Sequence, residues 1–196
     1  MSDYYLKGEE RFGYFMSIAY LAVTKIGSYK KFSNFIAEDI YSFRANTIVD
    51  IGTGPASIPI EISRLYKNKI SIFAVDPSKQ MVFIAKRRTK NYKNITIAVG
   101  SSRKIPFERK FDIILSSLSF HHWKEKEESL RYLKGFLKKD GEIRIYEYNR
   151  SRLSKMHAPI SQHSVSKEEL ENIGKKSGLK TKIKIFGEFI SARFIP

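Results

Sequence analysis

The sequence predicts an α/β fold with a mostly parallel sheet. Short apolar runs at positions 48–51, 70–75 and 95–99 have the length and β-branched character of buried strands. Apolar residues at helical spacing follow the first two runs. A glycine-rich turn joins the first run to its helix. Strands that alternate with helices in this way are typical of sheets whose neighbouring strands run parallel.

The glycine-rich turn ends the first predicted strand. Gly52 and Gly54 allow a sharp turn and a close approach to a ligand, because neither has a Cβ atom. Pro55 and Pro59 favour the first turn of a helix, where the missing N–H groups cost little. The apolar face of that helix consists of Ile58, Ile62 and Leu65. Its amino end therefore points N–H groups and the positive end of the helix dipole at a ligand.

Two acids indicate which ligand this turn binds. Asp50 lies two residues before Gly52, where a carboxylate suits an ammonium group better than a pyrophosphate. A dinucleotide fingerprint has a third glycine where this chain has Ser57, which disfavours a nicotinamide dehydrogenase. Asp76 follows the second strand, 76 − 54 = 22 residues after Gly54. In dinucleotide-binding folds, the acid that binds the ribose typically lies about 20 residues after the glycine-rich turn.

Residues 49–54 and 75–81 resemble two motifs of the class I S-adenosylmethionine-dependent methyltransferases. Matching stretches follow in the family's order at residues 100–107, 111–123 and 137–142. The resemblance is closest to the small-molecule, type 11 branch. It implies a Rossmann-like three-layer sandwich whose mostly parallel, seven-stranded sheet ends in an antiparallel C-terminal hairpin. It also implies S-adenosylmethionine as the cofactor and S-adenosylhomocysteine as the product.

The resemblance assigns cofactor contacts to residues of these motifs. Asp50 holds the methionine ammonium group, directly or through water, and Asp76 holds the ribose. Gly52 and Gly54 shape the turn. The other expected contacts are Thr53, Pro77, Met81, Ser101, Ser102 and Ser117. The family usually has an aspartate at the position of Ser101, so we expect this neutral side chain to bind adenine more weakly.

His121 and His122 are the paired titratable residues that follow the fourth predicted strand, at 111–117. The resembled family has its reaction zone there, and a histidine can take a proton from a hydroxyl or an acidic carbon as the methyl group arrives. Either histidine is therefore a candidate base, although both can instead orient the loop or pack on Trp123. We expect no metal site, because adjacent side chains rarely converge on one ion and no acidic or cysteine cluster accompanies them.

Residues 4–43 are rich in aromatic side chains and predict two helices with a break near Gly27 and Ser28. In the resembled family such a segment lies over the cofactor. We therefore expect a single domain, with residues 1–43 as a helical cap on a core formed by 44–196. An ordinary helix packed on the sheet edge is the alternative.

The second half of the chain predicts a helix at 124–138, a turn at 139–141 and a fifth strand at 142–148. Ser166 begins a capping box whose helix ends near Gly178, and residues 179–194 predict a hairpin. Glu147 lies near the end of the fifth strand. We expect it to be a surface acid paired with Arg144 or Arg150 rather than a substrate contact.

The composition limits the partners and the chemistry. The formal net charge is +16, from 36 Lys and Arg against 20 Asp and Glu. This charge favours anionic partners such as RNA, although a basic surface without a specific partner accounts for it as well. Cysteine is absent, which excludes disulfides and the thiolate chemistry of RNA cytosine-C5 methylation. The apolar run at 14–23 is too short to span a bilayer and no signal peptide is evident, so we expect a cytoplasmic protein.

These observations together predict an S-adenosylmethionine-dependent methyltransferase that acts on a small molecule. One alternative is an RNA methyltransferase that uses the basic surface. Another is a non-catalytic module that binds the cofactor or a partner. The methyl acceptor and the oligomeric state stay open.

Overall fold

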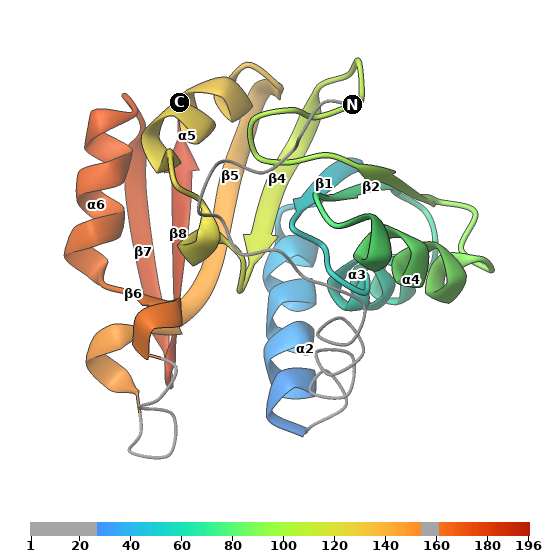
Figure 1. Ribbon diagram of the computed structural model, residues 1–196, viewed down its shortest axis with the longest axis horizontal. Coiled ribbons are helices and arrows are strands. Elements are labelled where there is room, and N and C mark those ends of the chain that lie inside the picture. Colours follow the sequence, from blue (N-terminus) through green and yellow to red (C-terminus); the bar gives the residue numbers. More distant parts are fainter. Residues whose placement is uncertain (1–26, 154–160) are drawn as a thin grey trace.

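The computed structural model describes residues 27–153 and 161–196 (Figure 1). The first of the two predicted amino-terminal helices lies outside these residues, and the second is α2. In chain order the helices and strands are α2 (Gly27–Ser42), β1 (Thr47–Ile51), α3 (Ser57–Leu65), β2 (Ser71–Asp76), α4 (Lys79–Thr89), β3 (Ile95–Val99), β4 (Phe111–Ser117), the 3-10 helix η1 (Phe120–His122), α5 (Lys126–Lys134), β5 (Leu137–Asn149), the 3-10 helix η2 (Arg150–Arg152), β6 (Ser164–Val165), α6 (Lys167–Lys176), β7 (Lys180–Phe186) and β8 (Phe189–Ile195).

The strands form one sheet in the order β3-β2-β1-β4-β5-β8-β7. Strands β3 to β5 are parallel, and β8 runs antiparallel to both of its neighbours. The two-residue β6 adds a short parallel pairing at the end of β5. The predicted sheet with its C-terminal hairpin is therefore confirmed, with β6 as an addition. The strand order reverses between β1 and β4, and ligands of such sheets bind at the carboxyl ends of the strands near this point.

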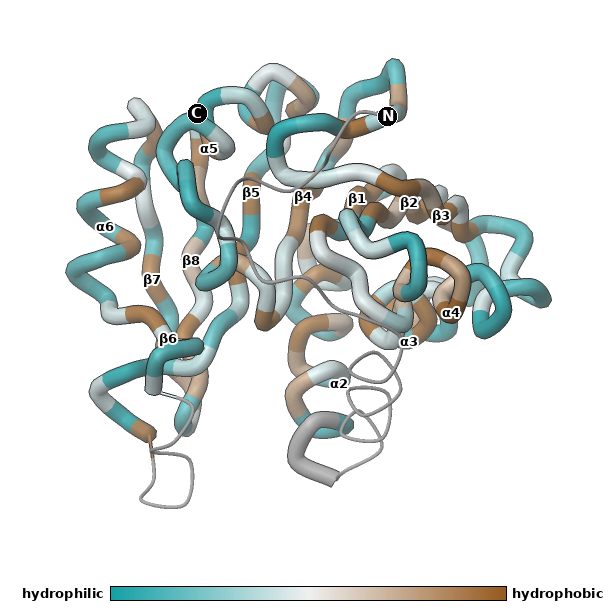
Figure 2. Tube along the Cα trace, in the orientation of Figure 1, coloured by the Kyte–Doolittle hydropathy of each residue, from teal (hydrophilic) through white to brown (hydrophobic). Residues whose placement is uncertain are grey.

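Helices cover both faces of the sheet, which makes three layers (Figure 1). On one face α2, α3 and α4 bury apolar side chains such as Ile36, Ile62 and Val82. On the other face α5 and α6 bury Leu133 and Leu170. Strands β1 and β2 are mostly hydrophobic and β5 carries charged residues among its hydrophobic ones, whereas hydrophobic and hydrophilic residues alternate along α6 (Figure 2). This pattern is expected of buried parallel strands and of a helix with one face against the core. Among the described residues, no helix combines the length and the apolar character that crossing a bilayer requires.

Residues 139–141 do not form the turn that the sequence predicts; they lie within β5. Strand β5 continues through them as a bulge: its register advances from Leu137 to Glu142 while that of β4 advances only from Phe111 to Ile113. Gly141 permits this close packing, because a Cβ atom there would lie 2.8 Å from the carbonyl oxygen of Phe111. Helix α5 consequently ends at Lys134 rather than near 138.

A buried network of charged and polar groups connects α2 to β5. The guanidinium of Arg144 donates to the backbone carbonyl of Asp39 at 2.7 Å and to its Oδ2 at 2.8 Å, and it also pairs with Glu142. The Tyr146 hydroxyl donates to the same Oδ2 at 2.7 Å. Arg193 supplies a second cation to Glu142 at 2.7 Å. Only 2% of Arg144 is exposed, so this network is screened from solvent.

We expect Arg144→Met to lower the free energy of unfolding by about 3 kcal/mol, because it leaves the carboxylate of Asp39 without its cation. Urea denaturation measures the change. Arg150→Met is the matched control, since Arg150 pairs with Glu169 at 3.1 Å but is half exposed. Its expected effect is below about 1 kcal/mol. Equal losses in the two variants would show that the network contributes no more than a surface pair.

Candidate functional site

The turn between β1 and α3 forms the first part of the site. Gly52 and Gly54 have φ values of 74° and 53°, in the left-handed region that glycine adopts without strain. Ala56 also has a positive φ, 59°, and begins α3 without a side-chain cap. The N–H groups of Gly52 and Thr53 donate to the carbonyl of Val75 at 2.9 and 3.0 Å. These bonds fasten the turn to the end of β2.

Asp76 stands at the carboxyl end of β2 and is buried. Its Oδ2 accepts the N–H of Gly54 and its Oδ1 accepts the N–H of Ser78, both at 2.9 Å. Burial raises the pKa of Asp76 to about 6. A carboxylate has about four lone-pair positions, so Asp76 can still accept hydrogen bonds from two ribose hydroxyls. Ser78 also caps the amino end of α4, because its Oγ accepts the N–H of Met81.

Asp50 is fully buried within β1, and neither carboxylate oxygen has a hydrogen-bond partner among the described residues. Burial is the main cause that raises the pKa of Asp50 to about 7; the Thr53 hydroxyl acts in the opposite direction, and the nearby charge of Asp76 acts in the same one. The buried Thr53 hydroxyl lies near enough to Asp50 to lower its pKa, but among the described residues it makes no full hydrogen bond either. A buried carboxylate without a partner is costly. An ammonium group that donates hydrogen bonds would satisfy it, so these residues fit the amino-acid end of S-adenosylmethionine.

The residues expected around adenine lie at the ends of β2 and β3. Met81 is buried in the first turn of α4. Ser101 is buried and exchanges two backbone hydrogen bonds with Lys104, each 3.1 Å long. The hydroxyl oxygens of Ser102 and Ser129 lie 3.0 Å apart, so the Ser102 side chain is engaged with α5. The sheet register pairs Asp76 with Val99, which places these residues beside the glycine turn.

Arg88 is a positioning residue that the sequence analysis did not identify. From the last turn of α4 its guanidinium donates to the carbonyl of Pro55 at 2.5 Å and to Ser57 Oγ at 2.9 Å. It therefore holds the turn at the start of α3. In the sequence it appears only as one member of a basic run, which gave no signal of this role.

The loop after β4 lies against the glycine turn. A Cβ atom on Gly52 would fall 1.9 Å from Ser119 Oγ, so the close approach requires glycine at this position. Leu118 has a φ of 48°, which is strained for a leucine, and its N–H donates to the carbonyl of Tyr146 at 2.9 Å. Ser117 is the last residue of β4 and is half-buried. The loop that carries the two histidines is thus held between the turn and β5.

The prediction that Glu147 is a surface acid is wrong. Its side chain is 0% exposed, and its Oε2 lies 2.9 Å from Nδ1 of His121. Its Oε1 accepts the His121 backbone N–H at 3.2 Å. Arg144 cannot reach it, because residues three apart along a strand point to opposite faces. Arg150 pairs with Glu169 instead.

The contact between Glu147 and His121 defines what the imidazole can do. A carboxylate only accepts hydrogen bonds, so Nδ1 of His121 carries the hydrogen and Nε2 presents a lone pair. That nitrogen can take a proton or bind an ion. The neighbouring His122 is a weaker base: burial, followed by the charges of His121, His163 and Lys126, lowers its pKa to about 3. The structure therefore favours His121 over His122 as the candidate base.

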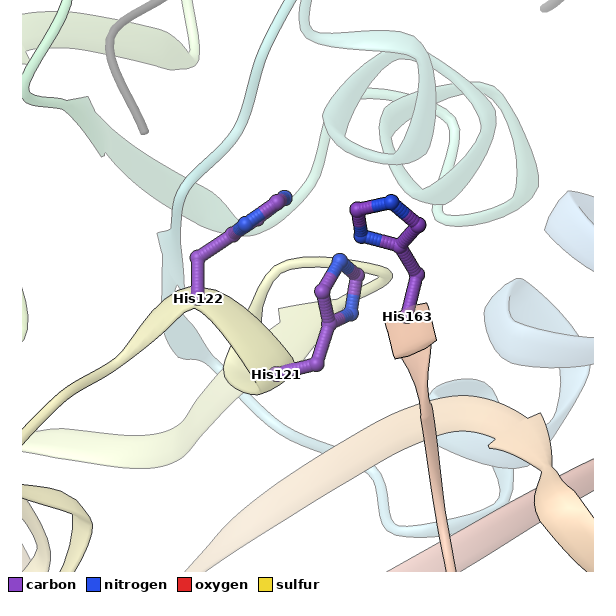
Figure 3. Close-up of side chains that lie close together, drawn as sticks. All are labelled: His121, His122 and His163. Carbon is purple, nitrogen blue, oxygen red and sulfur yellow. The ribbon is translucent and has the colours of Figure 1, made fainter. Parts of the chain in front are cut away.

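A third histidine, His163, joins the pair from the segment before β6 (Figure 3). Its ring centroid lies 5.0 Å from that of His121 and 5.6 Å from that of His122, which are themselves 4.0 Å apart. The pairing of Tyr148 with Ser164 positions it beside the end of β5. The expectation of no metal site rests on the adjacent pair His121 and His122 alone. Nothing in the sequence connected His163 to it, because a two-residue strand has no periodicity.

Comparisons with known proteins agree with this geometry. A family model described as a methyltransferase domain matches residues 48–141. The chain is 32% identical over 130 residues to an uncharacterized methyltransferase of Alkaliphilus oremlandii, covering 62% of this chain and 57% of that protein. It is 27% identical over 129 residues to a ubiquinone/menaquinone biosynthesis C-methyltransferase of Geotalea uraniireducens, covering 64% and 55%. The chain thus spans about half the length of these curated relatives.

A solved structure shows the same fold. A protein of Methanococcus maripaludis, assigned as an S-adenosylmethionine-dependent methyltransferase, matches with a TM-score of 0.79 at 23% identity. The match covers 97% of this chain and 96% of that one. The described arrangement of sheet and helices is therefore the one found in such proteins.

Proposed function

The chain belongs to the class I S-adenosylmethionine-dependent methyltransferases, and on that premise we propose that it transfers a methyl group to a small-molecule acceptor bound beside His121. The observation that carries the proposal is the buried carboxylate of Asp50, which no described residue satisfies with a full hydrogen bond, next to Asp76 at the carboxyl edge of the sheet. The sulfonium of the cofactor supplies an already activated methyl group. The task left to the protein is to align the acceptor with it.

In this proposal each end of the cofactor has its own set of residues. Asp50 accepts hydrogen bonds from the ammonium group, and the amino end of α3 attracts the carboxylate. Asp76 accepts from the ribose hydroxyls. Pro77 and Met81 contact the adenine ring, and Ser101 accepts from its amino group. Because the Ser102 hydroxyl is engaged with Ser129, its backbone is the part available to adenine.

His121 is the residue that we propose contacts the acceptor. Its Nε2 takes the acceptor's proton in the metal-free protein, while Glu147 fixes the ring and stabilises the imidazolium that forms. Both residues lie at the carboxyl ends of β4 and β5, next to the strand-order reversal. The acceptor therefore meets the cofactor over the loop that packs on Gly52.

A small-molecule acceptor is favoured over RNA by two observations. The relative from Geotalea uraniireducens is named for the biosynthesis of ubiquinone and menaquinone. The exposed lysines Lys180, Lys182 and Lys184 lie on β7, at the far edge of the sheet from β1. In the strand order β5 and β8 separate this basic strand from β4, where the candidate acceptor site lies.

The test uses methyl-labelled S-adenosylmethionine, the purified protein and a fractionated cell extract. We expect label in the low-mass or lipid fraction and none above background with the Asp76→Ala variant. Label confined to RNA would replace the small-molecule proposal and make β7 the docking surface. Cofactor binding without label in any fraction would favour a non-catalytic module.

Cofactor affinity should depend on pH through Asp50. Its pKa of about 7 means that the carboxylate takes up a proton as the pH falls through neutrality, and only the ionised form attracts the ammonium group. We expect the affinity for S-adenosylmethionine to fall roughly 25-fold between pH 7.5 and pH 5.5. The stability of the ligand-free protein should change in the opposite direction. A carboxyl whose folded pKa is raised stabilises the fold at low pH, and this contribution is lost as the pH rises through 7.

Calorimetric titration at several pH values measures the affinity. The Asp50→Asn variant is the control: it should bind more weakly and lose the fall in affinity near pH 7, keeping only the fall near pH 6 that protonation of Asp76 causes. A profile as steep as that of the wild type in this variant would assign the pH dependence to another group.

A further inference from the structure

We propose that His121, His122 and His163 bind one divalent transition-metal ion such as Zn²⁺, and that its remaining coordination position receives the methyl acceptor. The identity of the acceptor rests on the proposed function, whereas the ion site rests on the histidines alone. Two rings come from η1 and the third from the segment before β6, and all three turn toward one another (Figure 3). The inference rests on the proximity of these three imidazole rings.

The distances suit a single ion. One ring nitrogen from each histidine lies within 4.8 Å of those of the other two. A tetrahedral ion with metal–nitrogen distances of about 2.1 Å needs nitrogens about 3.4 Å apart. Rotation of the partly buried His122 and His163 rings about their side-chain torsions can close this difference while His121 keeps its contact with Glu147. The backbone of η1 and of the segment before β6 need not move.

The ligand chemistry selects the class of ion. Three imidazoles suit borderline metals such as zinc, whereas magnesium and calcium prefer oxygen ligands. Imidazole binds a metal in its neutral form, which histidine reaches near neutral pH. Lys126 is the nearby cation, and its ammonium group donates to the carbonyl of Trp123 at 2.9 Å. The carboxylate of Glu147, which contacts His121, provides a negative charge that offsets this cation.

Glu147 also gives His121 the support that metal-binding histidines usually have. A carboxylate bonded to one ring nitrogen fixes the tautomer and makes the other nitrogen a better ligand. The 2.9 Å contact between Glu147 Oε2 and His121 Nδ1 meets this description, with Nε2 as the ligand atom. Glu147 is fully buried, so water does not compete with His121 for its carboxylate.

Three protein ligands leave one position open, which is typical of catalytic rather than structural zinc sites. A hydroxyl or thiol bound there loses its proton to solvent more readily, because the cation stabilises the anion. The anion then attacks the methyl carbon. The new bond to oxygen or sulfur forms as the carbon–sulfonium bond breaks, and S-adenosylhomocysteine leaves. In the metal-loaded protein, His121 is therefore a ligand and not the base.

The first test measures metal binding without cofactor or acceptor. Chelator-treated, full-length protein is titrated with Zn²⁺ by calorimetry, and with Co²⁺ by absorption, which reports tetrahedral coordination. We expect one ion per chain, at least about 100-fold weaker binding by His163→Ala, and about 10-fold weaker binding by Glu147→Gln. His157→Ala is the matched control, because His157 is the fourth histidine of the chain, and it should bind as the wild type does.

Several outcomes would overturn the proposal. They are the absence of saturable binding by the wild type, unchanged affinity in His163→Ala, or loss of binding in His157→Ala alone. Melting temperatures within a few degrees of the wild type ensure that each variant is folded when it is titrated.

A second measurement separates this inference from the proposed function. Methyl transfer is compared in zinc-loaded and chelator-treated protein, and we expect at least a tenfold higher rate in the loaded form. Equal rates would overturn the acceptor-binding role while leaving the ion site in place. Metal binding without transfer in either form would refute the proposed function and leave the ion site standing.

Discussion

Replacing Asp76 by alanine is expected to weaken the binding of S-adenosylmethionine about 100-fold. Two hydrogen bonds from ribose hydroxyls to a buried carboxylate are lost, and each contributes about 1.5 kcal/mol. Their sum, about 3 kcal/mol, corresponds to two orders of magnitude in the dissociation constant. Calorimetric titration of the wild type and the variant measures the change.

Asp76 also has a structural role, because it accepts the N–H groups of Gly54 and Ser78. The control must therefore lose the same kind of bond elsewhere. Asp112 lies at the amino end of β4, opposite to the end of the sheet that holds Asp76. It accepts the N–H groups of Asn46 and Thr47 at 2.9 and 2.8 Å. We expect Asp112→Ala to lower the stability without changing the affinity for the cofactor. Equal losses of affinity in both variants would show that Asp76 acts only through the fold.

His121→Ala is expected to lower the turnover number by about 10²- to 10⁴-fold while the dissociation constant of S-adenosylmethionine stays within about twofold. The reason is that Nε2 of His121 serves either as the base or as a metal ligand, and the variant loses both functions. Single-turnover transfer of labelled methyl into the accepting fraction measures the rate. Calorimetry measures the cofactor affinity separately.

His163→Ala distinguishes the two roles of His121. It retains the bond between His121 and Glu147 but removes one proposed metal ligand. If His121 acts as a base, His163→Ala keeps most of the wild-type rate in chelator-treated protein. If the ion activates the acceptor, His163→Ala is as slow as His121→Ala even with zinc present. A wild-type rate in His121→Ala would remove this residue from the mechanism altogether.

The β1–turn–α3 unit, to which we assign the cofactor, could be predicted from the sequence because it is local in the chain. Strand β1, the glycine turn and α3 follow one another without interruption, so the apolar run and the glycines reveal the whole unit. Asp76 stands at a characteristic spacing after the turn. The Ser166 cap of α6 was predicted in the same way, from a residue type that has a strong positional preference.

The acceptor half could not be predicted, because it joins segments that are far apart in the chain. The burial of Glu147 depends on which face of β5 meets η1, and no residue near Glu147 indicates that. The residues Lys139, Asp140 and Gly141 suit a turn as well as a bulge, so the sequence alone does not distinguish the two structures. His163 reaches the other histidines only through the two-residue pairing of β6 with β5. Long-range packing decides each of these cases.

The most direct measurement is a crystal structure of the protein with S-adenosylhomocysteine. The account predicts the ammonium group at Asp50, both ribose hydroxyls on Asp76, and the sulfur facing His121 across the loop on Gly52. Anomalous scattering from the same crystals, soaked with Zn²⁺, would place the ion among the three histidines. A nucleoside bound away from Asp76, or an amino-acid end that does not reach Asp50, would contradict the central claim.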